Sequence, residues 1–277
     1  MATFSHIHRR GIVGRIRSSK ESKSLKGSTA VHIAASTRSL WEMPFAGACS
    51  QLQDLGFDKV ELYVSNQLEQ LQVEQITQNM ESTILEFREA SRLSPVALFI
   101  DEELSLSDFA LMVKFATQLK IAQITIQASE LGTPFNSEID RLKERNRMCL
   151  EEGIRLSIVT KTGRLTEDPH TALELCQSVK SLGVTLDPSY YICTPRGEIN
   201  HDMVYPKVVH CHLRDTSVSD IQVPAGLGEV DYNRIISMLE NESYDRVLSV
   251  DLLPRTLEGE ERLLELRKLR LLLESLL

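Results

Sequence analysis

Short runs of apolar and β-branched residues recur along the chain, and a stretch with helical spacing follows each of them. Runs of about four to eight such residues are typical of strands buried on both faces of a parallel sheet. The pattern predicts eight strands, over residues 30–36, 59–64, 95–101, 123–128, 154–160, 184–188, 207–213 and 246–251.

Between these runs, apolar residues repeat at helical intervals, and residues typical of helix ends flank several of the repeats. Asn136 and Asp168 are of the type that caps helix N-termini, and Gly56 is suited to a helix C-terminus. The pattern predicts helices over 41–55, the second half of 66–92, 107–119, 136–152, 169–180, 231–240 and 257–277.

Regular alternation of strands and helices predicts a parallel sheet covered by helices. Eight repeats allow the sheet to close, so we expect an α/β chain with one domain, a single (β/α)8 TIM barrel over residues 30–277. An open, doubly wound sheet is the alternative. The chain has neither GxGxxG after its first strand nor GxxxxGK[ST], so no dinucleotide or P-loop fold is indicated.

Three of the predicted strands end in polar groups. Asp187 closes the apolar run of the sixth strand, His210 and His212 lie in the seventh with Asp215 just beyond it, and Asp251 ends the eighth. Such groups meet at the carboxyl ends of barrel strands, where they could hold a divalent ion or a polyol. Asp187 could instead cap the turn that follows it.

The fifth strand differs, since it ends in Val159, Thr160 and Lys161 without an acid. The Lys161 ammonium could replace a cation and pair with Asp187 and Asp251. Two other interpretations remain open, a Schiff-base lysine and a side chain that points to solvent.

Composition narrows the functional classes. The 277 residues carry a net charge of −8 with a pI near 5.5, so no nucleic-acid partner is expected. The five cysteines lack a CxxC pair, which favours reduced thiols in a cytoplasmic protein. No apolar run is long enough for a membrane span or a signal peptide.

The first 29 residues form a separate, basic segment. Arginines and lysines at 9, 10, 15, 17, 20, 23 and 26 stand against a single acid, Glu21. We expect a mobile N-terminal tail, with a basic arm for an acidic partner or a transit-like peptide as alternatives.

The order LDPSYY, HCHLRD, GLGEVDY and YDRVLSVDLL resembles the xylose-isomerase-like TIM barrel superfamily. This superfamily includes sugar-phosphate isomerases and epimerases, hexulose 3-epimerases, inosose dehydratases and endonuclease-IV-type enzymes. The similarity runs over roughly residues 30–275, and Glu61 matches a position that is frequently acidic in the family.

The resemblance implies a divalent ion, Mn²⁺, Mg²⁺, Co²⁺ or Zn²⁺, with Asp187, His212 and Asp251 as ligands. The family's glutamate at the end of strand five has no counterpart here. Its frequent D-x-x-H motif on strand six is Asp187 with Tyr190. The acid/base pair that the epimerases take from strands five and eight is therefore incomplete.

Further groups complete the predicted site. His210 shares strand parity with His212 and could line the interior, Arg214 could clamp a ligand's carboxylate or phosphate or form a salt bridge, and Tyr190 could line the mouth. Asp215 could hold a histidine tautomer or serve as a loop acid. We assign catalytic roles to Asp251, Lys161 and Glu61, and substrate-binding roles to His210, Arg214 and Tyr190.

Two functions follow from this reading. The first is a sugar or sugar-phosphate isomerase or epimerase of carbohydrate metabolism, which transfers a proton next to a carbonyl with help from a divalent metal. The alternative is a metal-free, catalytically degenerate barrel that binds a polyol or a protein partner. An endonuclease-like enzyme would need more histidines than this chain has.

Leucines over 263–277 exceed what one helix face needs, so a homodimer could form.

Overall fold

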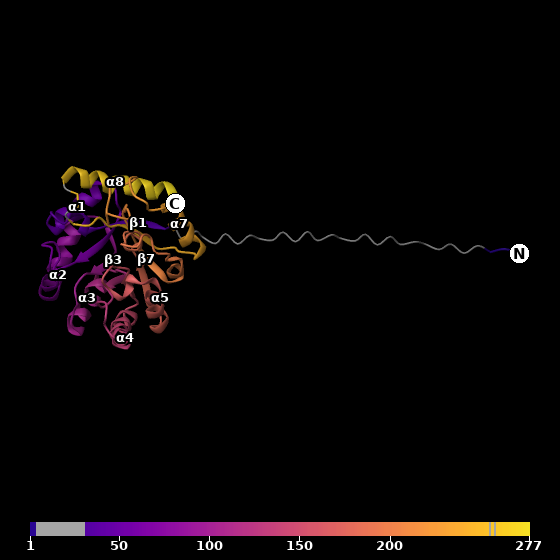
Figure 1. Cartoon of the computed structure of the whole chain (residues 1–277), viewed down its shortest axis with the longest axis horizontal. Helices are drawn as coiled ribbons and strands as arrows, with labels where there is room; N and C mark the ends of the chain where they lie inside the picture. Colours follow the sequence, from indigo (N-terminus) through magenta and orange to yellow (C-terminus); the bar gives the residue numbers. More distant parts are fainter. Residues whose placement is uncertain (4–30, 255, 258) are drawn as a thin grey trace.

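The computed structural model describes residues 1–3 and 31–277, apart from 255 and 258, and the chain forms a closed barrel of parallel strands (Figure 1). Each strand pairs with the next along the chain, and β8 closes the barrel against β1 through the register Ala35 to Val250. The strands are β1 His32–Ser36, β2 Lys59–Val64, β3 Ser94–Ile100, β4 Gln123–Gln127, β5 Arg155–Val159, β6 Gly183–Leu186, β7 Val208–Leu213 and β8 Val247–Val250.

Helices surround the strands and bury one face against them (Figure 1). Short 3-10 helices, labelled η, follow β1 and β5, and a third one lies in the β6–β7 connection directly before β7. The helical elements are η1 Thr37–Leu40, α1 Phe45–Asp54, α2 Val73–Ala90, α3 Leu106–Gln118, α4 Phe135–Glu151, η2 Leu165–Glu167, α5 Pro169–Ser178, α6 Ser189–Ile192, η3 Asp202–Lys207, α7 Tyr232–Asn241 and α8 Gly259–Leu276.

The single (β/α)8 barrel is confirmed, and the predicted strands agree with the observed ones to within about two residues. Helix ends agree less well. Asp168 caps α5 as expected, since its carboxylate accepts the Thr171 N–H at 2.9 Å. Asn136 was wrong as an N-cap, because α4 already begins at Phe135 after Pro134.

The barrel interior contains a layer of hydroxyl groups below the strand ends. Thr185 Oγ1 lies 2.9 Å from Thr125 Oγ1 and 2.6 Å from Ser157 Oγ, and Gln123 donates to Ser157 at 2.6 Å. All four side chains are buried. Because the hydroxyl groups of this layer hydrogen-bond to one another, the barrel interior accommodates these polar side chains.

Two predictions concern the ends of the chain. The basic segment 1–29 lies outside the described residues except for 1–3, so its role as a tail stays a prediction. On α8, Leu266, Leu269 and Leu273 are buried, whereas Leu264 and Leu271 are exposed. The homodimer that these leucines suggest also stays a prediction.

Among the described helices, none combines the length and apolar character needed to cross a membrane.

Candidate functional site at the carboxyl ends of the strands

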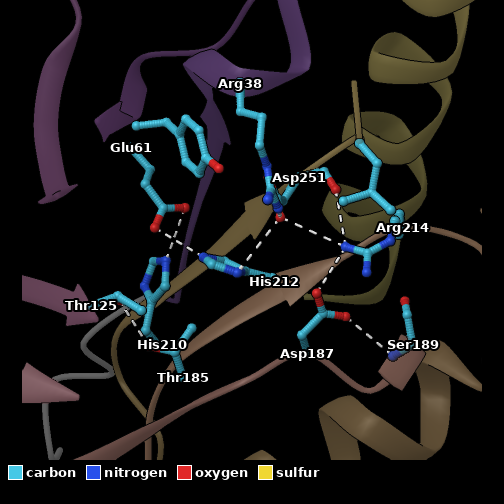
Figure 2. Close-up of polar contacts among 12 residues, drawn as sticks. Arg38, Glu61, Thr125, Thr185, Asp187, Ser189, His210, His212, Arg214 and Asp251 are labelled. Atoms are coloured by element: carbon cyan, nitrogen blue, oxygen red, sulfur yellow. Dashed lines mark hydrogen bonds and ion pairs between the residues drawn. The ribbon is translucent and has the colours of Figure 1, made fainter. Parts of the chain in front are cut away.

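The strand-end groups predicted from the sequence converge above the hydroxyl layer (Figure 2). Asp187 follows β6, His212 lies in β7 and Asp251 follows β8, and all three are almost completely buried. They offer ligand atoms that all lie within 4.8 Å of one another. The sequence therefore placed these three side chains together correctly, and their roles stay predictions.

Asp187 is held by its own turn and by the end of β5. Its side-chain Oδ1 accepts the Ser189 N–H at 3.2 Å, which is the turn-capping role considered above. Its backbone N–H donates to Thr160 Oγ1 at 2.8 Å, and this hydroxyl donates in return to the Asp187 carbonyl at 3.0 Å. Thr160 thus supports the position of Asp187 from the end of β5, the strand end at which the resemblance implied a glutamate.

Asp251 is paired with Arg38, a residue that the sequence analysis did not identify. Arg38 lies in η1, directly after β1, and its Nε donates to Asp251 Oδ1 at 2.9 Å while its Nη2 contacts Oδ2. The guanidinium also lies 4.8 Å from the centre of the Tyr63 ring and 5.6 Å from that of Phe99. A buried, bidentate ion pair of this kind fixes both partners.

Arg214 lies between the two strand-end aspartates. Its Nη1 is 2.8 Å from Asp187 Oδ2 and 3.6 Å from Asp251 Oδ2. Its Nε donates to the Ile221 carbonyl at 3.2 Å, and the Tyr190 ring centre lies 5.3 Å from the guanidinium carbon. Of the two roles considered for Arg214, the structure contains the salt bridge.

Glu61 bridges the two histidines of β7 from across the barrel (Figure 2). Its Oε1 is 2.9 Å from His212 Nε2, and its Oε2 is 3.3 Å from His210 Nε2. The other nitrogen of His212, Nδ1, is 3.6 Å from Asp251 Oδ2. His212 therefore connects the Glu61 carboxylate to the Asp251 carboxylate.

The ion pairs control ionisation at this site. Burial alone would raise the pKa of Asp251, but Arg38, His212 and Arg214 lower it below its usual value. Burial alone would likewise raise the pKa of Glu61, and the two histidines lower it. Burial would lower the pKa of His212, yet Glu61 and Asp251 raise it, which favours the imidazolium.

Acidic and basic side chains alternate in this cluster. The carboxyl groups of Glu61, Asp187 and Asp251 face two guanidinium groups and the imidazole of His212. Burial of charged groups in a protein interior requires such compensation.

A divalent ion does not fit the arrangement of Asp187, His212 and Asp251. Arg214 Nη1 occupies the space between the two carboxylates, and Arg38 already engages both oxygens of Asp251. Neither Val159 nor Thr160 at the end of β5 provides a carboxylate as a fourth ligand. The residues present satisfy the two acids with guanidinium groups.

Lys161 does not make the predicted pair with Asp187 and Asp251. Its Nζ lies 3.3 Å from Asp101 Oδ1, after β3. The Asp101 carboxylate also accepts hydrogen bonds from the Tyr63 hydroxyl and from Gln127 Nε2. Lys161 and Asp101 are partly exposed, with 26% and 12% of their side chains accessible, so they form the solvent-facing rim of the site.

Asp215 organises the loop after β7. Its Oδ2 accepts the N–H groups of Gly226 and Gly228 at 2.7 and 3.0 Å, and its Oδ1 accepts that of Thr216 at 3.0 Å. The role of a loop acid, one of the two that we considered, accounts for these contacts. The loop that contains GLGEVDY is thus attached to the end of β7.

A surface pocket of about 450 Å³ lies beside this site, between the β6–β7 connection and the start of α7. Its lining includes Asp202 and Arg234, which pair with each other at 2.8 Å, and Tyr205. Of the residues around Asp187, the lining reaches only Pro188. The pocket is therefore separate from the strand-end cluster.

Arg38 and Asp101 are the functional candidates that the sequence analysis missed. Asp101 ends the predicted strand 95–101, so the rule that identified Asp187 and Asp251 would have identified it too. Arg38 comes two residues after the end of β1, and a search for acids and imidazoles alone passes over it.

Comparison with known proteins agrees with this fold. The family model described as xylose isomerase-like TIM barrel matches residues 49–271. The chain belongs to this family. No curated protein matches the sequence at a significant level.

Several solved structures share the fold at low sequence identity. A xylose isomerase-like TIM barrel protein from Mycobacterium smegmatis in complex with magnesium superimposes with a TM-score of 0.72, at 15% identity over 90% of this chain and 99% of the other. D-allulose 3-epimerase from Methylomonas sp. gives 0.69, at 10% identity over 90% and 98%. A D-tagatose 3-epimerase-like protein gives 0.67, at 14% identity over 89% and 98%.

Proposed function

We propose that this protein binds a small sugar or polyol at the carboxyl ends of its strands, with Arg38 and Arg214 in place of the family's divalent ion. The observation that carries this proposal is the position of Arg214 Nη1 between Asp187 and Asp251. The family relationship supports the ligand class, because structural neighbours are named as sugar 3-epimerases.

Two groups near the strand ends retain hydrogen-bonding capacity that no described residue satisfies. Arg214 Nη2 is buried and has no hydrogen-bond partner among the described residues, and the same holds for Gln127 Oε1. A buried donor and a buried acceptor left unpaired cost stability in the free protein. The hydroxyl and carbonyl oxygens of a sugar could satisfy both.

The rim provides the remaining contacts. Lys161 and Asp101 would bond to hydroxyl groups of the ligand, and the half-buried Tyr190 ring would pack on its apolar face. In this proposal, Glu61, His210 and His212 lie below the ligand and support Asp251.

A binding experiment tests this function. Ligand-observed NMR against a panel of ketoses, aldoses, inositols and sugar acids should detect a binder equally well with and without added Mg²⁺ or Mn²⁺. Lys161→Met should weaken its affinity by about tenfold, the value expected for one charge-assisted hydrogen bond. Lys114→Met is the matched control, because Lys114 is exposed on α3. Binding that appears only when a divalent ion is added would contradict the proposal.

Proton transfer next to a carbonyl is a second candidate, supported by the adjacency of His212 and Asp251. His212 Nδ1 lies 3.6 Å from Asp251 Oδ2, and the unpaired Nη2 of Arg214 could donate to a carbonyl oxygen of the substrate. The guanidinium would stabilise negative charge on that oxygen. Asp251 would take the proton from the carbon next to the carbonyl.

Isotope exchange separates this candidate from binding alone. A bound ketose or aldose incubated in D₂O would gain deuterium next to its carbonyl if the protein transfers that proton. Exchange that disappears in Asp251→Asn, with sugar binding retained, would support an isomerase or epimerase. Absence of exchange for every bound sugar would leave the binding function alone.

A further inference from the structure

We propose that Glu61, His210 and His212 form a binding site for a transition-metal dication such as Zn²⁺ or Co²⁺, one layer below the strand-end aspartates. This site is distinct from the position that Arg214 occupies, and it does not depend on the proposed sugar-binding function. Glu61 lies in β2, and the two histidines lie on the same side of β7 (Figure 2).

Glu61, His210 and His212 offer ligand atoms that all lie within 4.8 Å of one another, and each carboxylate oxygen of Glu61 lies close to one imidazole nitrogen. Glu61 Oε2 and His210 Nε2 lie 3.3 Å apart, and Glu61 Oε1 and His212 Nε2 lie 2.9 Å apart. Two ligands bonded to a tetrahedral Zn²⁺ at about 2.0–2.1 Å lie roughly 3.3 Å from each other. Only small side-chain shifts are therefore needed to admit the ion.

Hydrogen bonding does not fully account for this cluster. Glu61 Oε2 and His210 Nε2 are both buried and face each other, yet neither has a hydrogen-bond partner among the described residues. The rings of His210 and His212 stand at 89° with centres 5.2 Å apart, so the two imidazoles approach the carboxylate from different directions. An ion between the three groups would coordinate both of these atoms.

Among the described residues, no arginine or lysine forms an ion pair with Glu61, so no side-chain cation competes with a metal ion for this carboxylate. Arg38 and Arg214 pair with Asp251 and Asp187, whereas Glu61 forms ion pairs with the two histidines only. The ion would thus enter this layer without displacing a guanidinium group. Two imidazoles and one carboxylate suit Zn²⁺, Co²⁺ or Ni²⁺ better than Mg²⁺.

Asp251 lies on the other side of His212. With Nε2 of His212 turned toward the ion, Nδ1 lies 3.6 Å from Asp251 Oδ2, slightly beyond hydrogen-bond distance, and a small shift of the ring would let it donate to that oxygen. A carboxylate behind a ligating histidine fixes its tautomer and orientation. Arg38 in turn holds Asp251 in place.

Metal content of the full chain tests this site. Because the ligands are at most 1% exposed, the protein is refolded from urea with Zn²⁺ or Co²⁺ and then freed of excess ion. We expect about one equivalent by mass spectrometry and the visible absorption of tetrahedral Co²⁺. Asp187→Asn should retain the ion, while His210→Ala and the more conservative His210→Gln should lose it, with circular dichroism confirming the fold of each.

Pulsed EPR of the Cu²⁺-loaded wild type provides a result that needs no variant. Two imidazole nitrogens should couple to the ion, since Glu61, His210 and His212 provide two histidines. A single coupled imidazole, or loss of the ion in Asp187→Asn but not in the His210 variants, would place the ion with Asp187, His212 and Asp251 and overturn the proposal. A wild-type protein that retains no ion would overturn it as well.

Discussion

At the residue scale, the two buried guanidinium groups determine how Asp187 and Asp251 are used. Each aspartate ends a strand, where this fold places its functional groups, and each is buried against an arginine. Removing one partner of a buried pair leaves the other charge without compensation, which destabilises a protein more than the pair itself stabilises it.

Arg38→Met should therefore lower the free energy of unfolding by about 3–5 kcal/mol, because Asp251 loses its bidentate partner. The double variant Arg38→Met, Asp251→Asn should recover part of this loss, because no unpaired carboxylate remains. Urea unfolding of the wild type, both single variants and the double variant gives the coupling energy. A coupling energy near zero would show that the two side chains do not interact in the folded protein.

The sequence could predict where the site lies but not how its charges pair. Strand ends are readable from apolar runs, so Asp187, His212 and Asp251 were placed together. Arg38 and Asp251 are 213 positions apart, and their contact arises only when the barrel closes. For the same reason, Lys161 could not be assigned to Asp101 in preference to the two strand-end aspartates.

At the scale of elements, carboxylates anchor the loops that surround the mouth. Asp215 holds the loop after β7 through the N–H groups of Gly226 and Gly228. The approach at Gly228 is very close: a Cβ atom there would lie 2.0 Å from Asp215 Oδ1 and 2.7 Å from the Thr216 carbonyl oxygen. This loop therefore requires glycine at position 228 for lack of space.

Gly228→Ala should destabilise the protein by about 1–3 kcal/mol, the usual cost of overpacking. A matched control needs a glycine that has room for a Cβ atom and no positive φ. Gly132 has a positive φ of 88°, so alanine there would be strained for a different reason. Gly47 is a better one, since a Cβ there would meet nothing closer than 3.8 Å. Thermal unfolding of Gly228→Ala and Gly47→Ala should thus differ clearly, and equal melting temperatures would argue against the close approach.

Glu138 anchors the loop before α4 in a similar way. It is buried, accepts the Ser129 N–H and hydroxyl at 3.1 and 2.6 Å, and pairs with Arg141 Nε at 2.7 Å. Arg141 also donates to the Gln127 carbonyl at 2.9 Å, next to the rim. Burial alone would raise the pKa of Glu138, but Arg141 and Ser129 lower it below its usual 4.5.

A lowered pKa contributes stability that is present above the unfolded-state value and is lost as the pH falls through the folded-state value. Wild-type stability should thus decline below about pH 4.5, and Glu138→Gln should decline less steeply there. At pH 7 the variant should be less stable by about 1–3 kcal/mol, because Arg141 loses a charged partner. Parallel stability curves for both proteins between pH 3 and 7 would refute this role.

The observed helix boundaries show which capping residues in the sequence predict a helix start correctly. Asp168 was a correct N-cap because its side chain and the following Pro169 both favour a helix start. Asn136 was wrong because Pro134 begins the turn two residues earlier. The short helix α6 and the 3-10 helices were not predicted, since elements of three to six residues leave no periodic pattern.

At the scale of the whole molecule, closure of the barrel accounts for both the success and the limits of the sequence analysis. Alternating strands and helices leave few topologies, so the pattern could predict a parallel sheet covered by helices, and eight repeats favoured the closed barrel over an open sheet. Closure brings β2 and β7 across from each other, which places Glu61 against His210 and His212. No local pattern carries that pairing, so its chemistry depended on the structure.

The central claim is that a guanidinium group occupies the position between Asp187 and Asp251. The resemblance of the sequence to the family implied a metal at this position. A crystal structure of the protein soaked in Mn²⁺, with anomalous diffraction recorded at the manganese edge, tests it directly. We predict no anomalous peak between these two carboxylates and Arg214 Nη1 within hydrogen-bond distance of Asp187. A manganese peak coordinated by Asp187 and Asp251, with Arg214 displaced, would contradict the account.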